Sequence, residues 1–143
     1  MRWIVFCFVS LLSACAPTGP GDSADAPAST GTAPAGPGEW QTLFDGTDLS
    51  AFTLLGDANW TIEDGAVGAD AGEGGHLVTN ERYADFEFEV EFFVSPDANS
   101  GVFIRCDDPE NVTATSCYEV NIYDTRPDQT YRTGGVVNLV EPA

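Results

Sequence analysis

Residues 82–95 read RYADFEFEVEFFVS and carry the clearest structural signal in the chain. From residue 86 to residue 94, apolar side chains alternate with acidic or apolar neighbours. One side of the run carries only Phe and Val, and the other side begins with three Glu residues. A period of two over this length predicts a β-strand with one buried face and one face in water.

Shorter strand signals lie on both sides of this run. Residues 60–67 (WTIEDGAV) read as two strands joined at Asp64-Gly65, a dipeptide that favours a hairpin turn. No stretch shows sustained helical periodicity, so the sequence predicts an all-β, antiparallel β-sandwich or jelly roll. The other predicted strands are 101–105, 118–123 and 134–140, with weaker candidates at 40–44 and 76–79.

The N-terminus reads MRWIVFCFVSLLSAC. Its apolar run, about ten residues, is too short to span a bilayer as a helix but suits a signal peptide. Leu12-Ser13-Ala14-Cys15 resembles the lipobox of bacterial lipoproteins, in which a peptidase cuts before a lipidated Cys. We therefore predict a signal peptide at 1–14 and a lipid anchor at Cys15; the alternative is an ordinary secretory signal. Ala16, rather than Asp, follows the Cys, which favours the outer membrane of the cell envelope.

Composition changes sharply after Cys15. Residues 16–38 consist almost entirely of Ala, Pro, Gly, Ser, Thr and Asp, which cannot offset the entropy of ordering. We predict a disordered tether at 15–38 and one folded domain at 39–143. The net charge is −18, with five Arg and no Lys, and removal of Arg2 with the leader makes it −19. This charge excludes nucleic acid as a favoured partner and leaves the lipid as the route to the membrane.

Cys106 and Cys117 remain after the leader cysteine Cys7 and the anchor Cys15 are set aside. An exported compartment permits a disulfide, and this pair flanks a loop between two predicted strands. A zinc site is the alternative, but two thiols without a nearby His make a poor ligand set. We expect a disulfide.

The two strands around that loop suggest a register. Pairing Ile104 with Val120 and Val102 with Ile122 places four aliphatic side chains on one face, whereas a slip by one residue would bury Glu119. The same register places Arg105 opposite Glu119 and Phe103 opposite Asn121. The other face would then carry Phe103, Arg105, Glu119, Asn121 and Tyr123.

Six short motifs follow one another along the folded part of the chain: 43–49 (LFDGTDL), 60–65 (WTIEDG), 83–86 (YADF), 99–105 (NSGVFIR), 118–124 (YEVNIYD) and Thr133-Gly134. In this order they resemble the 3-keto-disaccharide hydrolase domain family, also described as the 3-keto-glucoside lyase or 3-keto-2-hydroxyglucal hydratase domain. The resemblance covers about residues 39–140 and implies a concanavalin A-like jelly roll with a ligand cleft on its concave face. Family members continue with further strands, so we expect this chain to be a fragment of a longer product.

The resemblance implies cleavage of 3-keto-glycosides. A ketone at C3 acidifies the hydrogen on C2, so the reaction needs a base and a group that stabilises the developing enolate. We assign Glu119 as the candidate base and Arg105 as its partner or the enolate stabiliser. Asn121, Tyr123 and Phe103 would contact the oxidised sugar. No cofactor is certain, although a divalent cation could stabilise the enolate.

Plainer roles remain open for these residues. Arg105 and Glu119 could form a cross-strand ion pair, Asn121 could occupy a wet strand face, and Tyr123 could serve packing. His76 reads as structural or surface, Asp124 as a turn or cap, and the acidic loop Asp107, Asp108 and Glu110 as solvated rather than Ca²⁺-binding. The competing functions are a non-catalytic carbohydrate-binding module and a structural or adhesive surface lipoprotein.

Overall fold

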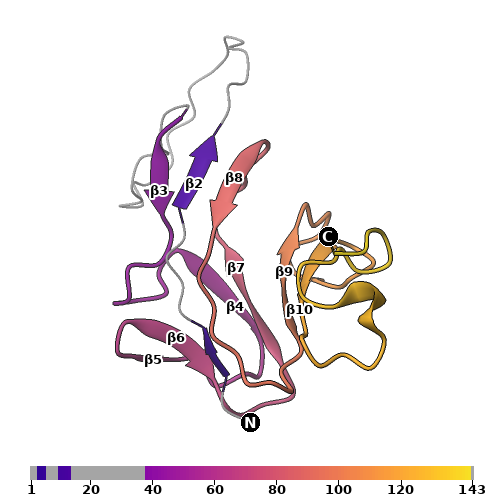
Figure 1. Ribbon diagram of the computed structural model, residues 1–143. Helices are drawn as coiled ribbons and strands as arrows, with labels where there is room; N and C mark the ends of the chain where they lie inside the picture. Colours follow the sequence, from indigo (N-terminus) through magenta and orange to yellow (C-terminus); the bar gives the residue numbers. More distant parts are fainter. Residues whose placement is uncertain (1–2, 6–9, 14–37, 143) are drawn as a thin grey trace, which may run out of the picture.

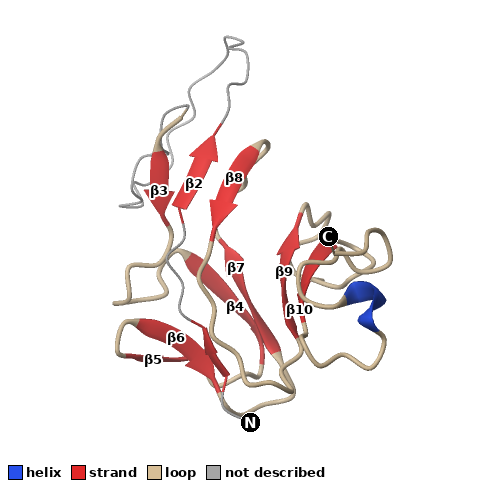
Figure 2. Ribbon diagram, viewed as in Figure 1, coloured by secondary structure: helices blue, strands red, loops and turns tan. Residues whose placement is uncertain are grey.

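The computed structural model describes residues 3–5, 10–13 and 38–142, which form antiparallel strand pairs and one short 3-10 helix (Figures 1 and 2). This confirms the predicted all-β class. In the described ranges, no helix has the length and apolar character needed to cross a membrane. The strands are β1 (Trp3–Val5), β2 (Ser10–Ser13), β3 (Trp40–Thr42), β4 (Phe52–Gly56), β5 (Thr61–Glu63), β6 (Ala66–Ala69), β7 (Gly75–Thr79), β8 (Phe86–Glu89), β9 (Ser100–Ile104) and β10 (Tyr118–Ile122), and the helix is η1 (Gln129–Tyr131).

The strands form four hydrogen-bonded groups, ordered β1-β6-β5, β3-β2-β8, β4-β7 and β10-β9. In Figure 1 the segment after β10 folds back beside that strand, on the side away from β9. Backbone hydrogen bonds tie the two together: the amides of Asn121 and Val137 donate to the carbonyls of Gly135 and Glu119, over 2.9 and 3.0 Å. The edge of β10 is therefore covered by irregular chain.

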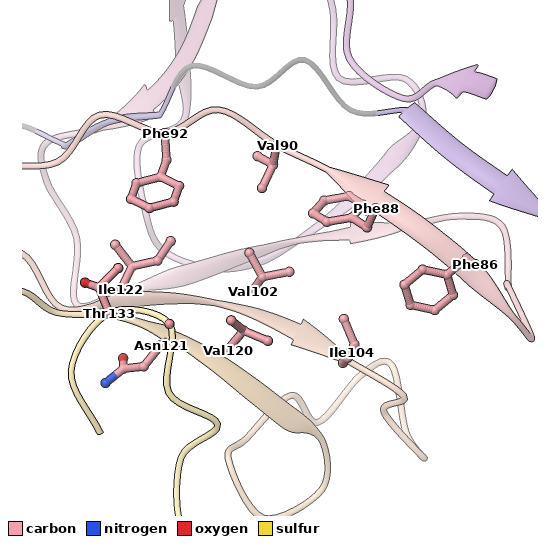
Figure 3. Close-up of a pocket in the computed structure, with 11 residues that line it drawn as sticks. Phe86, Phe88, Val90, Phe92, Val102, Ile104, Val120, Asn121, Ile122 and Thr133 are labelled. Carbon is pink, nitrogen blue, oxygen red and sulfur yellow. The ribbon is translucent and has the colours of Figure 1, made fainter. Parts of the chain in front are cut away.

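Two layers face each other where β8 passes over the β9–β10 hairpin. Figure 3 shows the apolar side chains of residues 86–92, the β8 layer, turned toward Val102, Ile104, Val120 and Ile122. An apolar cavity of about 310 Å³ lies between them. The even-numbered side chains of the hairpin thus form the inner face, as alternation along each strand requires.

The hairpin at residues 61–69 confirms the predicted turn. Asp64 and Gly65 have φ angles of 52° and 77°, so both central residues of the two-residue loop are left-handed. That backbone matches the twist of the flanking strands and suits an Asp-Gly pair. β6 is buried along its whole length, including Val67 with 2% of its surface exposed.

Other predicted strands differ from the structure. β8 ends at Glu89, before the alternating pattern ends, and Phe92 beyond it is 41% exposed. The predicted strand at 134–140 is wrong, because Val136 makes isolated bridges to Val120 and Val140 around a turn. β4 was not predicted; its sequence FTLLG does not alternate.

Two strands fall inside the predicted signal peptide. β1 pairs with β6, and β2 lies between β3 and β8. Cleavage before Cys15 would remove both strands. Cys15 and residues 16–37 lie outside the described part of the chain, so lipidation and the tether stay predictions.

Cys106 and Cys117 form the expected disulfide, with their Cα atoms 4.2 Å apart. The bond closes the loop between β9 and β10 across a separation of 11 residues. Replacing both cysteines with Ala should lower the free energy of unfolding by about 3 kcal/mol, because the unfolded chain regains loop entropy. Urea unfolding of the double variant, beside wild type with and without reductant, measures this loss. Equal midpoints would contradict it.

Candidate functional site

The candidate site lies on the outer face of the β9–β10 hairpin, which is the face turned away from the β8 layer. The observed register pairs Val120 with Val102 and Glu119 with Phe103. The predicted register is therefore wrong by two residues. A slip of two keeps each side chain on its predicted face but changes its cross-strand partner, so Phe103 takes the place expected for Arg105.

Glu119 is half-buried and extends over Gly101 on the neighbouring strand. A Cβ atom added to Gly101 would lie 2.9 Å from Cγ and 3.0 Å from Oε1 of Glu119. Burial raises the pKa of Glu119, and the positive charge of Arg126 partly opposes that rise. A half-buried carboxylate with a raised pKa is a better proton acceptor near neutral pH than an exposed one.

Gly101→Ala should displace this carboxylate while leaving the fold in place, because the atoms that must yield belong mainly to a flexible side chain. We expect the catalytic rate to fall by at least about 10-fold, since a small displacement of a reacting group slows a reaction strongly. Steady-state kinetics and thermal melting of Gly101→Ala and the control Ser100→Ala check this. Unchanged turnover in Gly101→Ala would show that the glycine does not position Glu119.

Arg105 follows β9 and turns toward the β8 layer. Its φ angle of 52° breaks the extended backbone, and its Nη2 lies 3.3 Å from Oδ1 of Asp85. The guanidinium also lies over the ring of Phe86, 6.0 Å from the centroid. The predicted position of Arg105 opposite Glu119 is wrong, and its proposed role beside that residue has no support in this placement.

Asn121 is buried, with 1% of its surface exposed, so the alternative that it occupies a solvent-exposed strand face is wrong, and its contact with the sugar stays a prediction. Its Nδ2 donates to the carbonyl of Tyr131, while its Oδ1 is buried without a partner in the described residues. Tyr123, just after β10, is half-buried, and its amide donates to Oγ1 of Thr133 over 2.9 Å. Thr133 in turn donates to Asp124, which agrees with the expected turn role of that acid.

Arg126 is the functional candidate that sequence reasoning missed. It lies in the turn after β10, with its guanidinium 5.7 Å from the centroid of the Tyr131 ring. It is the only basic residue whose charge acts on the pKa of Glu119 among the described groups. The sequence did offer one signal. Basic residues are rare in this acidic chain, which has five Arg and no Lys, and one of the five lies two residues after the family segment 118–124.

His76 on β7 lies near the candidate site. Its ring makes an edge contact with Phe103, with centroids 5.2 Å apart, and burial lowers its pKa. Both residues line a cavity of about 790 Å³ that also borders Arg105 and Glu110. Across the described ranges, no group of three or more His, Cys, Asp or Glu side chains is placed to hold a metal ion. The divalent cation stays an untested expectation.

Comparison of the sequence with known proteins identifies the family of the chain. A 3-keto-disaccharide hydrolase from Bacteroides thetaiotaomicron is 36% identical over 74 residues, covering 43% of this chain and 26% of that protein. The match thus spans about a quarter of the relative's length. No solved structure matches significantly. The family model described as the 3-keto-alpha-glucoside-1,2-lyase-like domain matches residues 39–143, so the chain belongs to that family.

Proposed function

We propose that this protein cleaves 3-keto-glycosides, including 3-keto-disaccharides, by elimination followed by hydration. Membership of the family supports the reaction class. The single structural observation that carries the proposal is Glu119, whose half-buried carboxylate lies over Gly101 on the face opposite the apolar interior. Such a group is suited to remove a weakly acidic C–H proton.

The chemistry follows from the ketone. The carboxylate of Glu119 takes the C2 proton, and the C–H electron pair moves to form an enolate on the C3 oxygen. When the enolate collapses back to the ketone, the C1–O bond breaks and the leaving sugar departs with a proton. Water then adds at C1, and a proton returns to C2, so the net reaction is hydrolysis. The burial and position of Glu119 support its proposed role as the base, and the enolate requires a separate electrostatic partner.

The test uses the full-length chain with 3-keto-trehalose or 3-keto-sucrose in D₂O. We expect release of the unoxidised sugar, together with 3-keto-glucose that carries deuterium at C2. A reaction without enzyme measures background exchange next to the ketone. Release of sugar without deuterium at C2 would point to direct hydrolysis, and binding without release would favour the carbohydrate-binding alternative.

We also propose that the mature protein is anchored in the cell envelope through lipid on Cys15. The lipobox Leu12-Ser13-Ala14-Cys15 supports this proposal. In an expressing bacterium, the wild-type protein should fractionate with membranes and incorporate labelled fatty acid, whereas Cys15→Ser should do neither. Labelled fatty acid in Cys15→Ser would overturn the assignment of the anchor.

A further inference from the structure

The turn after β10 is tied to that strand by several independent hydrogen bonds. We call residues 124–135 the return segment. The amide of Gly134 donates to the carbonyl of Asn121 over 2.9 Å, and the amide of Tyr123 donates to Oγ1 of Thr133 over 2.9 Å. η1 within the segment is capped by Asp128, whose carboxylate accepts from the amide of Thr130 over 3.0 Å. The segment is therefore held in one place relative to β10.

Asn121 provides the side-chain link between the segment and the candidate site. It is 1% exposed, and its amide donates to the carbonyl of Tyr131. Asn121 and Glu119 are two residues apart on one strand, so their side chains project from the same face. The hydrogen bond to Tyr131 thus holds the return segment against the face of β10 that carries Glu119.

Tyr131 in turn supports Arg126. The guanidinium stands 5.7 Å from the centroid of the tyrosine ring, within the range of a cation–π contact. The carbonyl of Arg126 also accepts from Nε2 of Gln129. A chain of contacts therefore runs from Asn121 through Tyr131 to the guanidinium of Arg126, whose positive charge acts on the carboxyl of Glu119.

We propose that Arg126 stabilises the enolate oxygen of the substrate and that Tyr131, which Asn121 ties to β10, is the residue that positions it. This inference rests on the proposed function. A guanidinium stays charged at all relevant pH values and presents several N–H donors to an oxyanion. Arg105 is less suited to the role, because its guanidinium forms an ion pair with Asp85.

The experiment compares the full-length variants Arg126→Gln and Arg105→Gln, which remove the same charge from two places. With 3-keto-trehalose, Arg126→Gln should lower kcat by about 100-fold with a much smaller change in KM, as expected when one oxyanion donor is lost. Arg126→Lys should recover part of the rate. Arg105→Gln should stay within about 3-fold of wild type, an effect that corresponds to a lost surface ion pair.

The positioning step is tested separately with Tyr131→Leu and Tyr131→Phe. Tyr131→Leu removes the ring but keeps the backbone carbonyl that Asn121 binds, and it should lower kcat by at least about 10-fold. Tyr131→Phe keeps the ring and should behave as wild type. In Arg126→Gln, adding Tyr131→Leu should cause little further loss, because the two changes act on one group. Additive losses would overturn the positioning role.

A second readout needs no turnover. The carboxyl group of Glu119, followed by carbon NMR, should titrate at higher pH in Arg126→Gln than in wild type and at the same pH in Arg105→Gln. The charged groups of the return segment are Asp124, Arg126, Asp128 and Arg132, and apolar Phe103 faces Glu119 from β9. An active wild type with an active Arg126→Gln overturns this inference alone, whereas an inactive wild type overturns the proposed function as well.

Discussion

Glu119→Gln should lower kcat on 3-keto-disaccharides by about 10²–10⁴-fold, the range that general acid–base catalysis contributes. The substitution keeps the size of the side chain over Gly101 but removes the carboxylate that accepts the C2 proton. Deuterium incorporation at C2 of the substrate should fall to the uncatalysed level. Full exchange in Glu119→Gln would remove this residue as the base, even if sugar release were slow.

The control for this variant is Glu87→Gln. Glu87 belongs to β8 and is exposed, so it presents the same chemical change on a wet face far from the hairpin's outer surface. We expect wild-type turnover from it. Thermal melting of both variants separates a catalytic loss from a loss of folded protein.

The pH dependence of the wild type follows from the same residue. Glu119 must be deprotonated to act as a base, so kcat/KM should be low in acid and rise through its pKa. Because burial raises that pKa and outweighs the opposing charge of Arg126, the rise should occur above the pH expected for an exposed Glu. In Arg126→Gln the rise should move further upward. A profile that follows an unshifted carboxyl would contradict the burial of the catalytic group.

Alternation in the sequence predicted most of the strands because a two-residue period depends only on which side chains meet water. The same property explains the register error. Faces depend on odd or even numbering, so shifting β10 by two residues leaves Val120 inside and Glu119 outside. The loop between Cys106 and Cys117 sets the observed register, and the conformation of an irregular loop cannot be predicted from hydrophobic periodicity.

The site was predictable only in part. Glu119 could be placed from its strand, because β10 continues the extended pattern through it. Arg105 could not, since the pattern does not reveal that its φ angle becomes positive and turns the side chain to Asp85. Arg126 lies in a turn, where its position depends on hydrogen bonds between β10 and residues up to eighteen positions later. Tertiary contacts of that kind cannot be read from local composition.

Phe44→Ala should have the largest effect on stability, lowering the free energy of unfolding by about 3–5 kcal/mol. Phe44 has 1% of its surface exposed and is among the largest fully buried side chains in the described part of the chain. Small domains hold only about 5–15 kcal/mol in total, so this loss would populate unfolded protein near growth temperatures. Thermal and urea unfolding of the full-length variant measure it.

Phe93→Ala is the matched control for that prediction. Phe93 is 62% exposed, so the same truncation removes little buried surface and leaves no closed cavity. The melting temperature should fall by about 12 °C or more in Phe44→Ala and by only a few degrees in Phe93→Ala. Similar shifts in the two variants would mean that Phe44 does not belong to the core that stabilises the fold.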